Sequence, residues 1–192
     1  MKRVALFGGS FDPIHRGHAF IAERAVERCA LDEVLFVPCW QSPHKAGVQM
    51  ASGDDRSAMV RLATQAFPWA TVSDWELDRK EPSYSWQTAE HWRSMLDEDD
   101  ELFWILGMDQ WSALSRWARV DYLARLVTFI VFPRDGEVPE EVEGRRAAFL
   151  PDAMAVSATE IRTRTAAGGS IEEDVGAEVA AYVKEKRLYR SV

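Results

Sequence analysis

Short runs of consecutive apolar residues alternate along the chain with longer segments in which apolar residues recur every three or four positions. The runs indicate strands buried on both faces, and the spaced pattern indicates helices with one buried face. The predicted strands cover 3–7, 33–38, about 71–77, 102–106, 127–132 and a short segment near 153–156. The predicted helices cover 17–29, about 54–67, 85–96, one or two short segments within 110–125, about 158–167 and about 174–186.

This alternation of strands and helices predicts an α/β domain with a doubly wound, mainly parallel sheet of five or six strands and C-terminal helices. The chain of 192 residues is long enough for one sizeable hydrophobic core, so we expect a single domain over 1–192. In such folds ligands bind beyond the carboxyl ends of the strands, where the strand order switches. We therefore expect catalytic and ligand-binding residues in the turns that follow the strands.

The composition narrows the class of protein. Hydrophobic residues make up 47% and charged residues 28% of the chain, as in an ordinary globular protein, and no apolar run approaches the roughly 20 residues that span a bilayer. The 23 Lys and Arg against 31 Asp and Glu give a net charge of −8, which argues against a nucleic-acid or membrane partner. The apolar run near the N-terminus is too short for the hydrophobic region of a secretory signal. The spacing of Cys29 and Cys39 suits a reducing, cytoplasmic location.

The turn after the first predicted strand, GGSFDPIHRGH over 8–18, carries most of the chemistry. Gly8 and Gly9 let the backbone approach a ligand, and a helix that begins near Gly17 directs free N–H groups to the same place. His15 and His18 add two hydrogen-bond donors, so the turn predicts a phosphate site. A tight structural connection with packed histidines is the alternative, and a zinc site lacks a convincing fourth ligand. The GxGxxG and GxxxxGK[ST] fingerprints are missing.

This turn resembles the signature of the HxGH nucleotidyltransferases, which implies a Rossmann-like nucleotidyltransferase fold. The segment VSATEIR over 156–162 is similar to the element of these enzymes that closes over the triphosphate. Independently of the resemblance, Ser157 and Thr159 offer hydroxyls at a helix start and Arg162 offers a planar guanidinium, all suited to phosphate oxygens. An N-capped surface helix with an ion-paired arginine is the alternative.

Three further stretches resemble the bacterial nicotinate-nucleotide adenylyltransferases: Pro43-His44-Lys45, Pro82-Ser83-Tyr84-Ser85, and Gly107-Met108-Asp109 with Arg116-Trp117. In that family an aromatic side chain stacks on the nicotinate ring, and backbone amides bind its carboxylate. Trp117 and the amides around Ser85 are the matching positions, with core packing as the alternative for Trp117. Ala118 stands where a tyrosine often follows, so one aromatic wall of the implied pocket is missing.

The resemblance implies AMP transfer from ATP to nicotinate mononucleotide, which gives deamido-NAD and pyrophosphate, with Mg²⁺ carried by ATP and no direct metal ligand from the protein. The implied catalytic residues are His15 and His18. The implied ATP and phosphate contacts are Gly8, Gly9, Ser10, Phe11, Lys45, Ser157, Thr159 and Arg162. Arg134 is a further expected phosphate contact, because it follows the end of the predicted strand 127–132. The implied nicotinate-nucleotide contacts are His44, Ser85, Asp109, Trp117 and Ala118. The C-terminal segment 157–192 is expected to pack on the nucleotide site.

Other functions stay open at this point. A nicotinamide-mononucleotide or phosphopantetheine adenylyltransferase shares most of these motifs, and a nucleotide sensor could keep the fold without turnover. We expect a monomer or a weak homo-oligomer. Two other arginines, Arg56 and Arg164, fall on predicted helices, where an exposed ion pair is the expected role.

Overall fold

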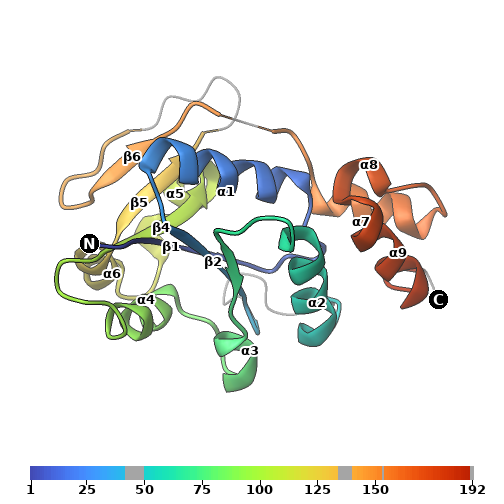
Figure 1. The fold of residues 1–192 in the computed structure, drawn as a ribbon, viewed down its shortest axis with the longest axis horizontal. Coiled ribbons are helices and arrows are strands. Elements are labelled where there is room, and N and C mark those ends of the chain that lie inside the picture. The colour runs from blue at the N-terminus through green and yellow to red at the C-terminus, as the bar shows by residue number, and fades with distance from the viewer. Residues whose placement is uncertain (42–49, 134–139, 153, 191–192) are drawn as a thin grey trace.

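The computed structural model describes residues 1–41, 50–133, 140–152 and 154–190, and its centre is one sheet of six strands with helices on both faces (Figure 1). The strands are β1 (Arg3–Gly9), β2 (Glu33–Pro38), β3 (Ala70–Val72), β4 (Glu101–Gly107), β5 (Thr128–Phe132) and β6 (Ala147–Phe149). Every pair of neighbouring strands is parallel, and the strand order is β3-β2-β1-β4-β5-β6. The predicted doubly wound α/β fold is therefore confirmed, with six strands.

The helices connect these strands and close the chain. They are α1 (Arg16–Cys29), α2 (Gly53–Thr64), α3 (Trp75–Arg79), α4 (Ser85–Arg93), α5 (Met108–Ser112), the 3-10 helix η1 (Leu114–Arg116), α6 (Val120–Leu126), α7 (Ala158–Ala166), α8 (Glu172–Val175) and α9 (Ala177–Glu185). Figure 1 shows α7, α8 and α9 grouped at one end of the molecule, and α9 packs against α2.

Two hydrophobic clusters lie on opposite faces of the sheet, because successive side chains of a strand point to opposite sides. From β1, Ala5 and Phe7 join the cluster that contains buried residues of α1, α2, α7 and α9. Val4 and Leu6 join the other cluster, which contains buried residues of α4, α5 and α6. The central strand is thus buried on both faces, as its unbroken apolar run predicts.

Two strand predictions were wrong in position. The last strand is Ala147–Phe149, and residues 154–156 form no strand. This edge strand has only three residues, two of them alanine, so its own propensity gives little signal. The strand predicted over 71–77 ends at Val72, because the Ser73 hydroxyl accepts the backbone N–H of Trp75 and Asp74 accepts the hydroxyl of Ser57 in α2.

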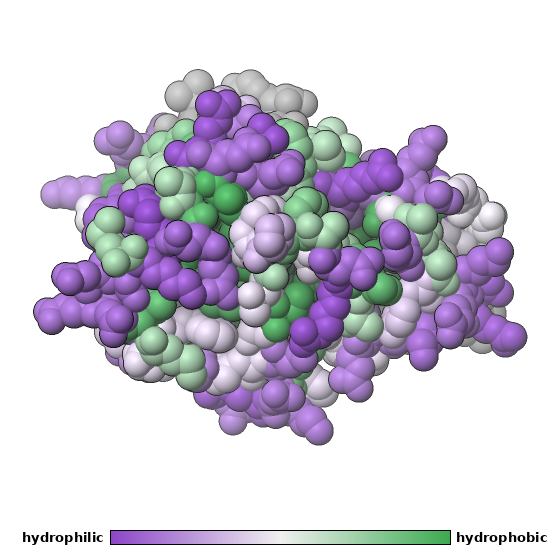
Figure 2. Space-filling view, in the orientation of Figure 1, coloured by the Kyte–Doolittle hydropathy of each residue, from purple (hydrophilic) through white to green (hydrophobic). Residues whose placement is uncertain are grey.

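The predicted helix at 174–186 is interrupted at Gly176, whose φ of 87° lies in the left-handed region that glycine favours. This residue separates α8 from α9 and turns the chain between them. In the described part of the chain, none of the helices combines the length and the apolarity needed to cross a bilayer. On the face drawn in Figure 2, hydrophilic residues predominate, and hydrophobic residues appear in small separate areas.

The strand order reverses direction between β1 and β4. From β1 the chain proceeds to β2 and β3 on one side, and then crosses back to β4, β5 and β6 on the other side. The carboxyl ends of β1 and β4 therefore lie side by side at the switch point, where α/β folds of this kind bind ligands.

Candidate active site

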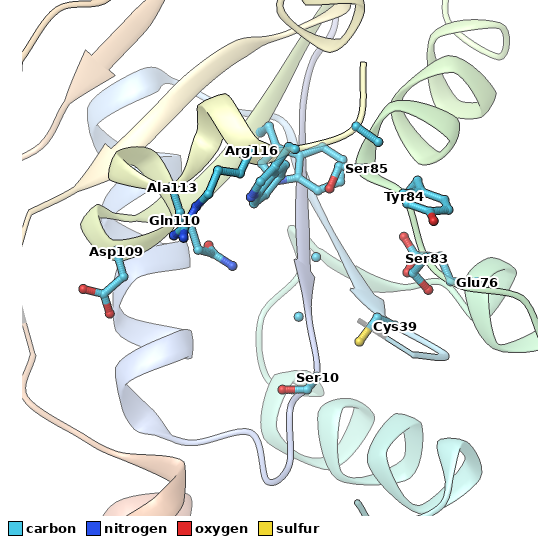
Figure 3. Close-up of a pocket in the computed structure, with 15 residues that line it drawn as sticks. Ser10, Cys39, Glu76, Ser83, Tyr84, Ser85, Asp109, Gln110, Ala113 and Arg116 are labelled. Carbon is cyan, nitrogen blue, oxygen red and sulfur yellow. The ribbon is translucent and has the colours of Figure 1, made fainter. Parts of the chain in front are cut away.

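A pocket of about 460 Å³ opens at this switch point. Its lining residues are Gly8, Gly9, Ser10, Cys39, Glu76, Ser83, Tyr84, Ser85, Trp104, Asp109, Gln110, Ala113, Arg116, Trp117 and Ala118. Figure 3 shows Glu76, Ser83 and Tyr84 on one side of the pocket and Asp109 with Gln110 on the other. The pocket thus joins the turn after β1 to the segments that follow β4 and precede α4.

The structure brings together many of the residues singled out in the sequence. Of the implied phosphate contacts, Gly8, Gly9 and Ser10 line this pocket, and of the implied nicotinate contacts, Ser85, Asp109, Trp117 and Ala118 line it as well. The lining does not include the implied residues Phe11, His15, His18, Ser157, Thr159 and Arg162. His44, Lys45 and Arg134 lie outside the described residues.

A side chain at either of the two glycines that end β1 would be crowded by aromatic rings. A Cβ at Gly9 would lie 3.0 Å from Cζ of Phe11, and a Cβ at Gly8 would lie 3.1 Å from Cζ2 of Trp104. The Phe11 ring is buried against Phe7, with ring centroids 5.6 Å apart. Phe11 also has a φ of 46°, in the left-handed region. Its side chain supports the turn from the core, so only its backbone is suited to contact a phosphate.

The two histidines of the turn stack on each other at the start of α1. Their ring centroids are 3.8 Å apart, with 25° between the planes. The backbone N–H of His15 donates to Nδ1 of His18 over 3.3 Å. Because Nδ1 of His18 accepts this bond, the proton of the neutral ring lies on Nε2. The Phe11 ring packs edge-on against His18, with centroids 5.1 Å apart, and fixes the orientation of this imidazole.

His15 is buried, and its environment disfavours a charge. Burial lowers the pKa of His15 to about 4, and the carboxylate of Asp174 opposes this effect only in part. Its Nδ1 atom is buried and has no hydrogen-bond partner among the described residues. At neutral pH this histidine is therefore uncharged, so it can act only as a dipolar donor or acceptor.

The start of α7 touches the same turn from the C-terminal part of the chain. Ser157 caps α7 by accepting the backbone N–H of Glu160 over 3.5 Å. Arg162 donates through Nη1 to the backbone carbonyl of Asp12 over 2.7 Å and through Nη2 to Oγ1 of Thr159 over 3.2 Å. The guanidinium of Arg162 is thereby held beside the turn that carries the histidines.

Asp12, in the middle of this turn, is a buried junction between distant segments. Its Oδ1 accepts the hydroxyl of Tyr189 over 2.7 Å and the backbone N–H of Ala51 over 3.1 Å. Burial raises the pKa of the Tyr189 hydroxyl, and the Asp12 carboxylate reinforces this shift. Tyr189, which follows α9, is thus hydrogen-bonded to the turn.

The expectation of an exposed ion pair was wrong for Arg56. This side chain is 1% exposed and donates to the backbone carbonyls of Ser10 over 2.8 Å, Ala51 over 3.1 Å and Trp40 over 3.5 Å. A sequence signal existed, because Arg56 precedes the buried Met59 by one helical turn and so shares its face. The same expectation is confirmed for Arg164, which pairs with Asp174.

The opposite side of the pocket is built by α4 and the segment before α6. Ser85 is the first residue of α4, and no side chain caps this helix start. Unpaired N–H groups at a helix start favour an anion. The Trp117 ring lines the pocket and also packs edge-on against Trp104, with centroids 6.4 Å apart, so packing and ligand contact are compatible for this side chain.

One pocket residue with an ionisable side chain, Glu76, was not predicted from the sequence pattern. Its carboxyl group is buried and accepts the hydroxyl of Thr88. Burial raises the pKa of Glu76, while hydrogen bonds from Ser83 and Thr88 and the charge of Arg79 partly counteract this. It falls in the segment predicted as a strand, so periodicity gave no indication that this carboxyl faces a pocket.

Comparisons with known proteins agree with this geometry. The profile of the cytidylyltransferase-like family matches residues 6–164. A relative from Solibacter usitatus, named "Probable nicotinate-nucleotide adenylyltransferase", is 42% identical over 190 residues, which cover 97% of this chain and 99% of the relative. A relative of the same name from Dehalococcoides mccartyi (strain CBDB1) is 34% identical over 198 residues, covering 97% of each.

A solved structure also has the same fold. The nicotinic acid mononucleotide adenylyltransferase of Plasmodium falciparum, complexed with NaAD, superposes with a TM-score of 0.82 at 17% identity and covers 98% of both chains. The full-length similarity to the curated relatives shows the family. This chain therefore belongs to the nicotinate-nucleotide adenylyltransferases, within the cytidylyltransferase-like group.

Proposed function

We propose that this protein transfers AMP from ATP to nicotinate mononucleotide and releases pyrophosphate, forming deamido-NAD. The observation that carries this proposal is a pocket that joins the glycine-containing end of β1 to Ser85, Trp117 and Ala118. A ligand with a phosphate at one end and a planar ring at the other fits such a pocket. The family relatives bear the name of this activity.

The reaction needs no nucleophile from the protein. An oxygen of the mononucleotide phosphate attacks the α-phosphorus of ATP, a new P–O bond forms, and the bond from the α-phosphorus to the bridging oxygen breaks. The electron pair of that bond leaves with pyrophosphate. The protein must hold the two substrates in line and stabilise the charge on the phosphate oxygens.

In this proposal, His18 and Arg162 stabilise this charge. The hydrogen bond to Nδ1 of His18 assigns its proton to Nε2, from which it can be donated to a phosphate oxygen. The two contacts of Arg162 use two of the five N–H donors of a guanidinium, so others remain for phosphate oxygens. The buried, neutral His15 orients its partner by stacking and adds a dipolar contact.

Mg²⁺ would come with ATP. The described residues contain no group of three or more His, Cys, Asp or Glu side chains that could hold a metal ion. An ion held by phosphate oxygens and water needs no such group, since Mg²⁺ commonly keeps several waters and binds substrate phosphates. It would neutralise phosphate charge, and Asp109, which lines the pocket, would hold a metal-bound water or a ribose hydroxyl.

Ring recognition would depend on stacking and on backbone amides. Trp117 offers a planar face, and the backbone N–H groups near Ser85 and Ala118 would bind the nicotinate carboxylate. An amide in place of that carboxylate would direct NH₂ donors at protein donors, which leaves a buried N–H unpaired. The pocket therefore favours the acid over the amide.

Three further expectations belong to this proposal. The contacts of Arg162 and Tyr189 with Asp12 support a C-terminal segment 157–192 that packs on the nucleotide site of a single domain. Cys29 and Cys39 form no disulfide, which suits a cytosolic enzyme. Its partners would be ATP and nicotinate mononucleotide, with no nucleic acid or membrane, and it would act as a monomer or weak homo-oligomer.

Pyrophosphate release from ATP tests the proposed function. The purified protein is assayed separately with nicotinate mononucleotide, nicotinamide mononucleotide and phosphopantetheine. We expect turnover with the first substrate. Turnover only with one of the other two would assign a different adenylyltransferase, and ATP binding without any pyrophosphate release would favour a sensor.

A further inference from the structure

Three carbonyl oxygens at the end of β1 and in the turn that follows it are held by donors from other segments. The carbonyl of Gly9 accepts the backbone N–H of Cys39 over 2.9 Å, that of Ser10 accepts Nη1 of Arg56 over 2.8 Å, and that of Asp12 accepts Nη1 of Arg162 over 2.7 Å. A carbonyl oxygen that faced the polyphosphate would repel it. These three bonds therefore turn the oxygens toward the protein.

From this arrangement we propose that Arg56 is a positioning residue for the polyphosphate of ATP, acting through the Ser10 carbonyl; the inference rests on the proposed function. The C=O of Ser10 and the N–H of Phe11 belong to one planar peptide unit and point in opposite directions. By fixing the first, Arg56 directs the second to the other side of the turn. Arg56 needs no contact with ATP for this role.

The shape of the guanidinium makes this role specific to arginine. Arg56 joins carbonyls from three separate segments, because Ser10 follows β1, Trp40 follows β2 and Ala51 precedes α2. No carboxylate of the described residues forms an ion pair with it. A planar fork can satisfy three fixed acceptors at once, whereas a lysine ammonium is a compact point charge on a flexible stem.

The neighbouring carboxylate of Asp12 is satisfied by other groups. Its Oδ1 accepts from the Tyr189 hydroxyl and the Ala51 N–H, both uncharged donors. The guanidinium of Arg56 therefore binds backbone oxygens, and its positive charge lies next to Ser10 of the turn that would hold the phosphates. This charge adds to the attraction for a polyanion.

The test compares Arg56→Lys and Arg56→Gln with the wild type. Affinity for inorganic tripolyphosphate and for a non-hydrolysable ATP analogue is measured by calorimetry, alongside KM for nicotinate mononucleotide. We expect both variants to bind the two polyphosphates about 10-fold or more weakly, because a charge-assisted hydrogen bond that orients the turn is lost. KM for the mononucleotide should change less than about threefold, since affinity is lost only at the polyphosphate.

Arg61→Lys and Arg61→Gln are the matched controls. Arg61 lies on the same helix but is exposed and pairs with Asp74, so its variants should leave both affinities unchanged. A folded Arg56→Lys variant that binds tripolyphosphate like the wild type would overturn the inference. Equal losses for both substrates would also overturn it, because they would indicate a general structural role.

A measurement on the wild type covers the case in which the Arg56 variants do not fold. The Nη1–H resonance of Arg56, which donates to the Ser10 carbonyl, is followed by NMR while tripolyphosphate is added. We expect the chemical shift of this resonance to change, and its exchange with water to slow, as tripolyphosphate binds at the turn. No change at saturating tripolyphosphate would contradict the inference. Wild-type protein that binds tripolyphosphate but does not turn over nicotinate mononucleotide would refute the proposed function alone.

Discussion

His15 and His18 are coupled through both ring and backbone. Their imidazoles stack with centroids 3.8 Å apart, and the backbone N–H of His15 donates to Nδ1 of His18. Since burial keeps His15 neutral, His18 is the histidine suited to donate from Nε2 to the reacting phosphates.

Replacing His18 with alanine should lower kcat by about 100-fold or more, since a lost donor to transition-state charge typically costs ~10² to 10³ in rate. Turnover is measured by pyrophosphate release at saturating substrates. His91→Ala is the control, because His91 stacks on Trp75 outside the pocket. Unchanged turnover of the His18 variant would refute its assignment.

The low pKa of His15 predicts a loss of stability in acid. In the unfolded chain this group binds a proton below about pH 6.5, whereas in the folded protein it does so only below about 4. The unfolded state therefore binds more protons between these values, and stability falls as pH decreases through that window, by roughly 3 kcal/mol from this group. Denaturant unfolding at pH 7 and pH 4.5 should show a smaller loss for His15→Asn than for the wild type. An equal loss would show that this group is not the cause.

Tyr189 should stabilise the protein through its bond to Asp12. Removing the hydroxyl in Tyr189→Phe leaves the buried carboxylate with one fewer donor, which typically costs about 1 to 3 kcal/mol. Tyr182→Phe is the matched control, because its hydroxyl donates to Asp55 at the less buried surface of α2. Similar free energies of unfolding for Tyr189→Phe and the wild type would contradict the importance of this contact.

Trp117→Ala should weaken the acid and amide mononucleotides together, because stacking does not distinguish a carboxylate from an amide. The measurement is kcat/KM for each substrate in the wild type and the variant. Unaltered kinetics would assign Trp117 to packing against Trp104 alone.

How much the sequence predicts depends on how local the determinants are. The turn after β1 was recognisable because its glycines and histidines lie within one short segment and act through local backbone geometry. Arg56 was misjudged because its role depends on three segments that meet only in the fold. The edge strand Ala147–Phe149 was misplaced because pairing with β5, rather than its own residues, makes it a strand.

The pocket residues also divide into those that a local sequence segment indicates and those whose role depends on distant segments. Ser85 and Trp117 were found through family-like segments, and the structure places both in one pocket. Glu76 was missed because a five-residue helix leaves too few positions for a periodic pattern. Its burial depends on Thr88, in another helix, which no local pattern around Glu76 reveals.

The most direct test of the proposed function is the ratio of kcat/KM for nicotinate mononucleotide to that for nicotinamide mononucleotide in the wild-type protein. A pocket that binds the carboxylate through the amides near Ser85 and Ala118 should favour the acid by ~10² or more, because the amide substrate leaves a buried donor unpaired. Equal values for the two mononucleotides would contradict the carboxylate site and favour a nicotinamide-mononucleotide adenylyltransferase.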